Sequence, residues 1–214
     1  MERALTQVAG EAIAITAAGR TDSGVHARGQ VISFDLAWRH GEQALLRAIN
    51  ANLPQDIALL DLSLAAPDFH PRFDARRRKY LYYVYNRPVR SPLYRLYSWH
   101  IQRPLALDAM NAAAEHLAGT HDFSTFGQPP QGDNTVRELF EASWRRDGEL
   151  LVFDIEGNAF LYRMVRSIVG SLRAVGQGEW TVDEFVDAFN AGDRSRAAPT
   201  APPHGLVLFS ITYD

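Results

Sequence analysis

Short stretches in which apolar and polar residues alternate recur along the chain, and this pattern is typical of half-buried β-strands. The predicted strands span residues 11–18, 30–36, 57–64, 79–86, 150–155 and 206–213. Apolar residues at helical spacing predict helices over residues 42–49, 108–118, 162–175 and 182–190. Strands that come in pairs, with helices between them, favour an α+β fold with helices on one face of its sheets over a strictly alternating parallel sheet.

The predicted strand 79–86 is aromatic on both faces. Because side chains alternate along a strand, Tyr80 and Tyr82 fall on one face, and Tyr83 and Tyr85 fall on the other. We expect the strand to end before the proline that follows it, since proline cannot donate a backbone hydrogen bond.

The composition indicates a folded protein without covalent cross-links. Of its 214 residues, 46% are hydrophobic and 22% are charged, which suits one large domain or two small ones with a real core. Cysteine is absent, which excludes disulfides, thiolate metal sites and a cysteine nucleophile, and suits a reducing compartment. With no long apolar run and no secretory leader in the sequence, we expect a soluble cytoplasmic protein with no membrane partner.

The charge of the chain is unevenly distributed. A formal net charge of −3 excludes a globally basic nucleic-acid binder. Residues 1–67 carry a net −2, residues 68–105 a net +7 and residues 106–214 a net −8. All basic residues except Lys79 are arginine. A GC-rich genome would produce that bias, but planar guanidinium groups also bind phosphates with two parallel hydrogen bonds.

Residues 19–27 form a loop of small residues between two predicted strands, and it presents an arginine, an aspartate and a histidine. Asp22 could serve only the geometry of a tight turn. Arg20 favours a chemical role, because a cation beside a carboxylate stabilises the ionised form that acts as nucleophile or base. His26 has no cluster of other ligands near it in the sequence, so we expect a hydrogen-bonded structural histidine and no metal site.

This loop resembles the active-site motif of the tRNA pseudouridine synthase A family. Further segments that resemble the family follow in the family's order and spacing: residues 50–54, 56–57, 69–73, 78–80, 158–160, 164–166, 168–170 and 205–206. The resemblance therefore covers essentially the whole chain.

The resemblance implies a fold and an activity. It implies a pseudouridine synthase fold of two domains with mixed or antiparallel sheets, flanking helices and a cleft between the domains. We place the N-terminal domain, with the Asp22 loop, at residues 1–67 and the C-terminal domain at residues 68–214. The implied enzyme isomerises uridine to pseudouridine at positions 38, 39 and 40 of the tRNA anticodon stem-loop. It uses no cofactor and no metal, and it works as a homodimer.

The resemblance also assigns the candidate catalytic residues. Asp22 is the nucleophile; attack on the sugar, attack on the base and removal of a ribose proton all stay open. Tyr80 stacks on the base that leaves the helix, a contact worth about 1–3 kcal/mol. Arg166 pairs with Asp22. Arg20 has a further candidate role, since it could occupy the gap that the extruded nucleotide leaves in the stem.

A basic and aromatic segment, residues 69–80, is predicted to contact RNA. Alone, a run of charges is more often a solvated face. Next to a motif that resembles the family's RNA-contacting segment, the run is predicted to follow phosphates. The residues assigned to RNA binding are Phe69, His70, Pro71, Arg72, Phe73, Arg76, Arg77 and Arg78.

Two departures from the family pattern affect these expectations. The chain begins inside the family's first helix, so the first strand is expected to be missing, through a late start codon or because the chain is a natural fragment. The alternative function is therefore a catalytically impaired tRNA-binding fragment or paralogue, and a weaker rival is a nucleoside or glycoside hydrolase that uses Asp22. Residues 133–135 read Asp-Asn-Thr where relatives often have Ser-Arg-Thr, which leaves the role of loop 127–137 open.

Overall fold

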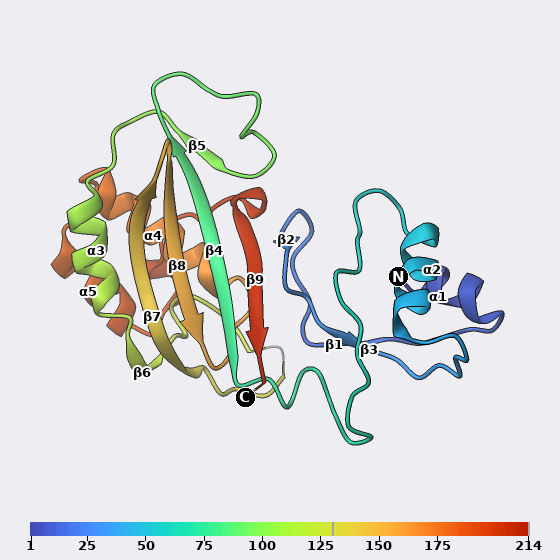
Figure 1. Ribbon diagram of the computed structural model, residues 1–214. Coiled ribbons are helices and arrows are strands. Elements are labelled where there is room, and N and C mark those ends of the chain that lie inside the picture. The colour runs from blue at the N-terminus through green and yellow to red at the C-terminus, as the bar shows by residue number, and fades with distance from the viewer. Residues whose placement is uncertain (130, 214) are drawn as a thin grey trace. The chain divides into compact units, whose positions relative to one another are not determined.

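The computed structural model describes residues 1–129 and 131–213, and the chain packs into two compact units (Figure 1). Unit 1 consists of Met1–Arg20 and Val31–Asp74, and unit 2 consists of Thr21–Gln30 and Ala75–Asp214. By packing, the loop that carries Asp22 therefore goes with the second unit. Pro130, in the loop whose role the sequence leaves open, lies outside the described residues.

Unit 1 combines two helices with one small antiparallel sheet. The helices are α1 (Glu2–Ala9) and α2 (Glu42–Asn52), and the paired strands are β1 (Thr16–Ala17) and β3 (Ile32–Ser33). Leu5, Leu45 and Ile49 form its buried centre. The predicted helix 42–49 is confirmed, and the two predicted strands on either side of the glycine loop are present but shorter than expected.

The predicted strand 57–64 is wrong. All eight residues are described, and none belongs to a strand. Side chains satisfy this backbone instead: the Asn50 amide group donates to the Leu59 carbonyl and accepts from the Leu59 amide, both at 2.8 Å. Leu59 packs against the centre of unit 1, while the side chains of Leu60 and Leu64 are exposed. Part of this apolar segment therefore packs along the core of unit 1, but the segment has no neighbouring strand to pair with.

Unit 2 is built on a seven-stranded mixed sheet. The strands run in the order β2-β9-β4-β8-β7-β6, and β5 pairs with β4. The β2–β9 and β4–β5 pairs are parallel, and the other pairs are antiparallel. The strands are β2 (His26–Ala27), β4 (Arg77–Asn86), β5 (Trp99–Ile101), β6 (Gly119–Asp122), β7 (Val136–Asp147), β8 (Leu150–Gly157) and β9 (Leu206–Thr212).

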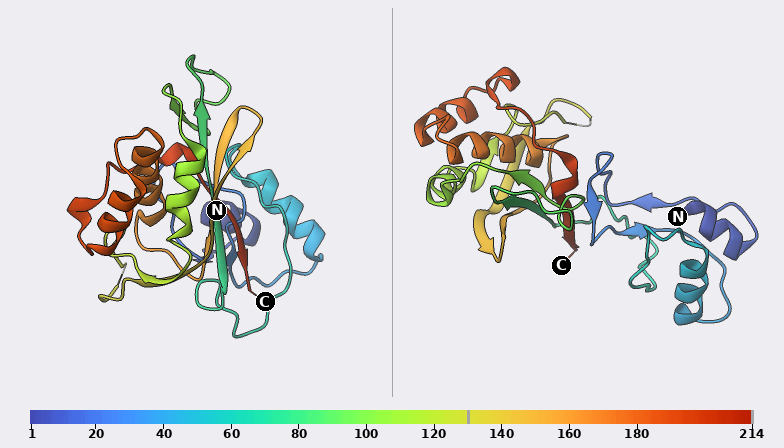
Figure 2. Two further views of the ribbon diagram at one scale, coloured as in Figure 1. Left: turned by 90° about the vertical axis from the view of Figure 1, so that its left-hand side faces the viewer. Right: turned by 90° about the horizontal axis from the view of Figure 1, so that it is seen from above.

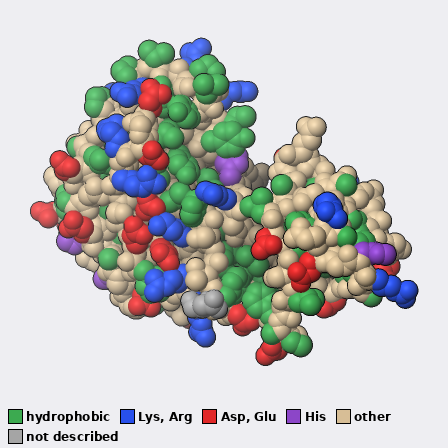
Figure 3. All heavy atoms as spheres, in the orientation of Figure 1, with side chains coloured by type: hydrophobic (Ala, Val, Ile, Leu, Met, Phe, Trp, Pro, Cys, Tyr) green, Lys and Arg blue, Asp and Glu red, His purple; other side chains and the backbone are tan. Residues whose placement is uncertain are grey.

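The three helices of unit 2 cover one face of this sheet (Figures 1 and 2). They are α3 (Leu107–Glu115), α4 (Met164–Gly176) and α5 (Val182–Asn190), and short 3₁₀ turns lie at Arg194–Arg196 and Pro203–Gly205. Large side chains that are almost fully buried fill the space between helices and sheet: Tyr82, Phe123, Phe126, Phe153 and Phe185. The opposite face of the sheet carries acidic and basic side chains close together (Figure 3).

The predicted α+β class, with mixed sheets and flanking helices, is confirmed. The predicted strands 79–86, 150–155 and 206–213 correspond to β4, β8 and β9, and the last three predicted helices correspond to α3, α4 and α5. The sequence missed β7 because it buries only Leu139 and Trp144 among its twelve residues and has charged residues on both faces. Within residues 1–129 and 131–213, no helix is long and apolar enough to cross a membrane.

Gly170 allows α4 to pack closely on the segment that precedes β9. A Cβ at this position would collide with the carbonyl oxygen of Pro199. We expect Gly170→Ala to lower the free energy of unfolding by about 1–3 kcal/mol, because a well-packed site cannot accept a methyl group without strain. Denaturant unfolding measures the change.

Ser167→Ala is the matched control on the same helix. The Ser167 hydroxyl is buried and has no hydrogen-bond partner among the described residues, so its removal is expected to be neutral or slightly stabilising. Equal unfolding free energies for Gly170→Ala and the wild type would contradict the close packing.

Candidate active site

The Asp22 loop is attached to the edge of the unit 2 sheet. Its short strand β2 runs parallel to β9, with His26 opposite Val207. Gly24 has φ +82°, and the Val25 amide donates to the Asp22 carbonyl at 3.0 Å, which closes a tight turn. Glycine suits this position because a side chain would be strained at positive φ. Asp22 therefore lies at the start of a turn that the sheet holds in place.

Asp22 forms an ion pair with Arg166. The Nη1 group of Arg166 donates to Asp22 Oδ2, and the two side chains are 13% and 20% exposed. Arg166 lies in the first turn of α4, and its Nε donates to the carbonyl of Ala201 at 2.8 Å. The Ala201 amide donates in turn to the Arg166 carbonyl at 3.0 Å. One guanidinium is thus held on two sides, and the ion pair predicted from the sequence is present.

Tyr80 lies near this pair on β4. Its ring meets Phe160 edge to face, with the ring centres 5.0 Å apart. Phe160 belongs to the turn between β8 and α4, and the carbonyl of Asn158 in the same turn accepts from Arg78 Nη1 at 2.6 Å. Arg78 and Tyr80 fall on the same face of β4 because they are two residues apart.

The charges around Tyr80 act on its hydroxyl in opposite directions. Burial raises the pKa of Tyr80, the Asp22 carboxylate raises it further, and the Arg78 guanidinium lowers it. Burial also raises the pKa of Tyr82, whose hydroxyl donates to the Pro202 carbonyl at 2.8 Å. Tyr80 is therefore a neutral phenol close to a negative and a positive group.

His26 connects the Asp22 loop to the segment between β4 and β5. Its Nε2 donates to the carbonyl of Leu96 at 2.9 Å, and its ring lies 4.8 Å from that of Tyr97, centre to centre. This confirms the prediction of a hydrogen-bonded structural histidine. The loop is therefore held from two directions, by β9 and by this segment.

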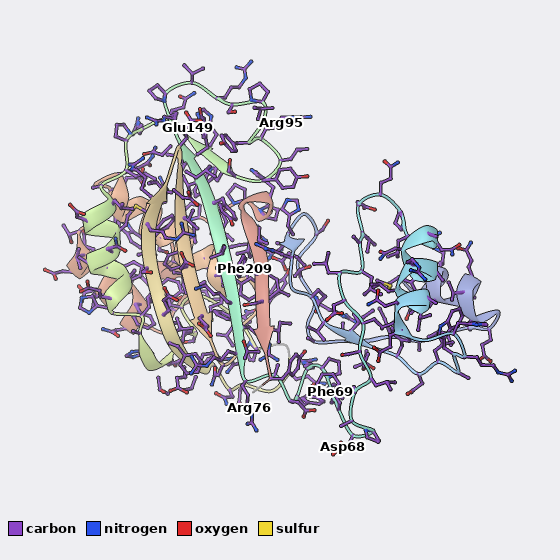
Figure 4. The ribbon with its side chains drawn as sticks, in the orientation of Figure 1. Asp68, Phe69, Arg76, Arg95, Glu149 and Phe209 are labelled. Atoms are coloured by element: carbon purple, nitrogen blue, oxygen red, sulfur yellow. The ribbon has the colours of Figure 1, made fainter. Side chains whose placement is uncertain are left out.

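The other candidate residues lie in two different parts of the chain. Arg20 belongs to unit 1 and is exposed, as is Phe73. Residues 69–73 form a turn in which His70 Nδ1 accepts from the amides of Arg72 and Phe73, at 3.2 and 3.3 Å. Phe69 begins this segment (Figure 4), and Pro71 is buried. The Arg72 guanidinium lies 5.8 Å from the centre of the Phe73 ring.

The run of four cations in residues 76–79 is largely engaged within unit 2. Arg77 approaches Glu156 at 3.7 Å and lies over the Phe140 ring. Lys79 contacts Glu141 and Asp154, at 3.1 and 3.2 Å. Burial lowers the pKa of Lys79, but hydrogen bonds to the two carboxylates outweigh it and raise the pKa overall.

Arg76 differs from the three cations that follow it. Its side chain is exposed just before β4 (Figure 4), and it forms no ion pair with any described residue. Strand alternation explains the difference among the others, because Arg77 and Lys79 face the charged side of the sheet and Arg78 faces the Asp22 side.

Sequence reasoning assigned no role to two groups at the site. Phe160 was part of a matching motif, but nothing local shows that it meets Tyr80. The contact between Arg166 and the Ala201 carbonyl cannot be predicted from residue type, because every residue has a backbone carbonyl that can accept a hydrogen bond. The proline-rich run around it, residues 199–203, was the one sign of an irregular segment.

The arrangement suits chemistry by a carboxylate. Asp22 pairs with Arg166, and one-fifth of its side chain is exposed, so the carboxylate is not sealed from solvent. A carboxylate with these neighbours can attack an electrophilic carbon or take up a proton.

Comparison with known proteins shows which family the chain belongs to. The sequence model that matches, over residues 113–214, is that of a class described as tRNA pseudouridine synthase. Proteins named tRNA pseudouridine synthase A are similar over the whole chain. The one from Pelobacter propionicus is 42% identical over 214 residues, which is 100% of this chain and 88% of the relative.

Two further relatives agree with this match. The protein from Geobacillus sp. is 44% identical over 216 residues, covering 100% of this chain and 87% of the relative. The protein from Neisseria meningitidis serogroup B is 42% identical over 214 residues, covering 100% of this chain and 81% of the relative. The chain belongs to the tRNA pseudouridine synthase A family.

Titration of Tyr80 tests the electrostatics of the site. Asp22→Asn removes a negative charge that opposes phenolate formation, so we expect the pKa of Tyr80 to fall relative to the wild type. Arg78→Gln removes the opposing positive charge, so we expect that pKa to rise. NMR of ring-labelled tyrosine as a function of pH reports both changes.

Asp193→Asn serves as the control for this titration. Asp193 is an exposed aspartate whose hydroxyl and amide partners belong to Ser195, so its replacement should leave Tyr80 unchanged. An unchanged Tyr80 pKa in Asp22→Asn would mean that the carboxylate does not lie beside the phenol.

Proposed function

We propose that the protein isomerises uridine to pseudouridine in tRNA, at positions 38, 39 and 40 of the anticodon stem-loop, with Asp22 as the catalytic carboxylate. The observation that carries this proposal is the pairing of Asp22 with a guanidinium that is itself fixed on Ala201. The names of the relatives, which cover this chain from end to end, supply the reaction.

The reaction is balanced without an external reagent. The bond between the ribose C1′ and the uracil N1 breaks, the uracil turns, and a bond forms between C1′ and C5. A proton leaves C5, and one is taken up at N1. An isomerisation of this kind needs a carboxylate near the ribose or the base. Whether that carboxylate attacks the sugar, attacks the base or removes a ribose proton, its contact with Arg166 holds it in place.

Tyr80 is proposed to hold the extruded uracil. The target base has to leave the helical stack before its glycosidic bond is accessible, and an aromatic ring compensates for part of the lost stacking. Tyr80 is supported edge to face by Phe160, so its ring orientation is set before RNA binds. Arg20 is proposed to enter the stem in place of the extruded nucleotide.

The RNA-binding residues are proposed from segments 69–73 and 76–78. Arg72, Phe73 and Arg76 are exposed and so present charge and an aromatic ring directly to solvent. His70 and Pro71 shape the turn that presents them, and Phe69 is its first residue. Arg77 and Arg78 already have partners within unit 2, so any contact they make with phosphates is shared with those partners.

The setting of the reaction is part of the same proposal. A tRNA substrate and the absence of cysteine from the sequence suit a cytoplasmic enzyme. The family resemblance supports a homodimer, in which one tRNA spans both subunits.

Replacement of Asp22 tests the catalytic assignment. We expect Asp22→Asn and Asp22→Ala to lower pseudouridine formation by about 10³-fold or more while tRNA binding is retained, since the carboxylate acts in bond breaking and not in RNA attachment. Carbodiimide mapping of tRNA incubated with each protein locates the modified positions, and filter binding measures affinity.

Different outcomes of that experiment point to different functions. Turnover by Asp22→Asn close to that of the wild type would refute the assignment. If the wild-type protein binds tRNA but forms no pseudouridine, it is a tRNA-binding protein. If it releases free uracil, it is a hydrolase.

Arg166→Lys tests the need for a guanidinium. An ammonium can contact Asp22 or the Ala201 carbonyl but cannot hold both through one planar fork, so Asp22 loses its fixed orientation. We expect kcat to fall by about a hundredfold with a smaller change in KM for tRNA. Steady-state pseudouridine formation at several tRNA concentrations gives both values.

Arg173→Lys is the control on the same helix. Arg173 contacts Gln177 and Glu179, outside the site, and its replacement should leave kcat near the wild-type value. A fully active Arg166→Lys would show that charge alone, without orientation, is sufficient.

A further inference from the structure

A cavity of about 250 Å³ lies between the segment that joins β4 to β5 and the turn that precedes β9. Its main side chains are two arginines, two histidines and two tyrosines: Arg90, Arg95, His100, His204, Tyr85 and Tyr94. None of the described residues that line it is acidic. All of them belong to unit 2. None has a role in the proposed reaction.

The two arginines are available for a ligand. Arg90 and Arg95 are exposed, and neither forms an ion pair with any residue in the described part of the chain. Figure 4 shows Arg95 on the segment that projects beyond the end of β4, and Figure 3 shows blue and green side chains gathered at this end of unit 2. A guanidinium without a carboxylate partner is a strong site for phosphate, which it binds through two parallel hydrogen bonds.

The cavity is lined by aromatic rings that pack against one another. The ring of Tyr85 lies 5.2 Å from that of Tyr94 and 5.7 Å from that of His100, centre to centre. His100 Nε2 donates to the Arg87 carbonyl at 2.8 Å, and the Ser98 hydroxyl donates to the Tyr94 carbonyl at 2.9 Å. The first bond holds the His100 ring and the second holds the backbone of Tyr94, so a planar base could stack on rings that are already packed together.

The cavity is connected to the Asp22 loop through two of its walls. The segment that carries Arg95 continues to Leu96 and Tyr97, which hold His26. His204 follows Pro203, whose Cγ would lie 3.2 Å from a Cβ at Gly24. A ligand in the cavity is therefore bound next to the loop that presents the candidate nucleophile.

We propose that this cavity binds one nucleotide of the substrate tRNA, other than the reacting uridine, with its phosphate on Arg90 and Arg95 and its base against Tyr94. The proposal rests on the proposed function for the identity of the RNA. A volume somewhat below the usual range of about 300–1,000 Å³ for small-molecule pockets suits a single nucleotide rather than a large cofactor. By binding a nucleotide that does not react, the cavity would help to position the tRNA relative to Asp22.

The double variant Arg90→Gln and Arg95→Gln tests the phosphate contact. We expect tRNA affinity to fall by about tenfold, the effect of losing one charge-assisted contact. The slope of log K against log salt should decrease by about 0.7–0.9, the value for one neutralised phosphate. Filter binding at several salt concentrations measures both quantities.

A second double variant is the charge-matched control. Arg146 and Arg196 are exposed and lie outside the cavity, so Arg146→Gln with Arg196→Gln removes the same charge from other surfaces of unit 2. We expect this control to bind tRNA with nearly wild-type affinity. Equal losses in the two double variants would overturn the proposal, because they would show only the effect of net charge.

Ser91→Phe distinguishes occupancy of the cavity from attraction at its rim. Ser91 lines the cavity, and a phenyl group there fills space while every charge is retained. We expect an affinity loss of about tenfold, comparable to that of the arginine variant. Wild-type affinity in Ser91→Phe would overturn the proposal, since no nucleotide would then enter.

Light scattering separates nucleotide binding in the cavity from contact with another protein. If the arginine variant changes the molecular mass in solution without changing tRNA affinity, the cavity binds a protein surface and the proposal fails. The cavity variants all keep Asp22, and their test is tRNA affinity. The catalytic assignment is tested separately by the activity of Asp22→Asn. An active Asp22→Asn would refute that assignment without changing the result for the cavity.

Discussion

The guanidinium of Arg166 is the contact on which the candidate site depends. It joins three segments of unit 2: helix α4, the backbone at Ala201 and the loop of Asp22. Both charges are largely withdrawn from water, so each one needs the other. The hydrogen bond from Arg166 to the Ala201 carbonyl limits the movement of the guanidinium. The carboxylate is thereby oriented before any substrate arrives.

The position of this pair follows from how the sheet is built. A strand of two residues, β2, is enough to add the Asp22 loop to β9, because His26 secures its other side on Leu96. At Gly29, two residues after the loop, the chain comes so close to β9 that a side chain would collide with the backbone of Phe209. The loop therefore packs with unit 2, although the residues on both sides of it belong to unit 1.

The fold was predictable where burial leaves a periodic pattern. Strand β4 and helix α5 have clear apolar faces, and their predicted limits agree with the structure to within two residues. Strand β7 buries only Leu139 and Trp144, so its pattern was too weak to detect. Residues 57–64 have an apolar pattern but no strand, because Asn50 takes the hydrogen bonds of Leu59 that a neighbouring strand would make.

The sequence by itself determined the types of side chain and their local order: a carboxylate in a glycine-rich turn, a tyrosine-rich strand and a run of cations. Only the tertiary structure decided their partners. It joined Asp22 to Arg166 across 144 positions, and it paired Lys79 with acidic residues of two other strands. It also gathered Arg90 and Arg95 with His204 around one cavity. The physical reason is that periodicity reflects contacts between near neighbours, whereas ion pairs and cavities form between segments that only folding brings together.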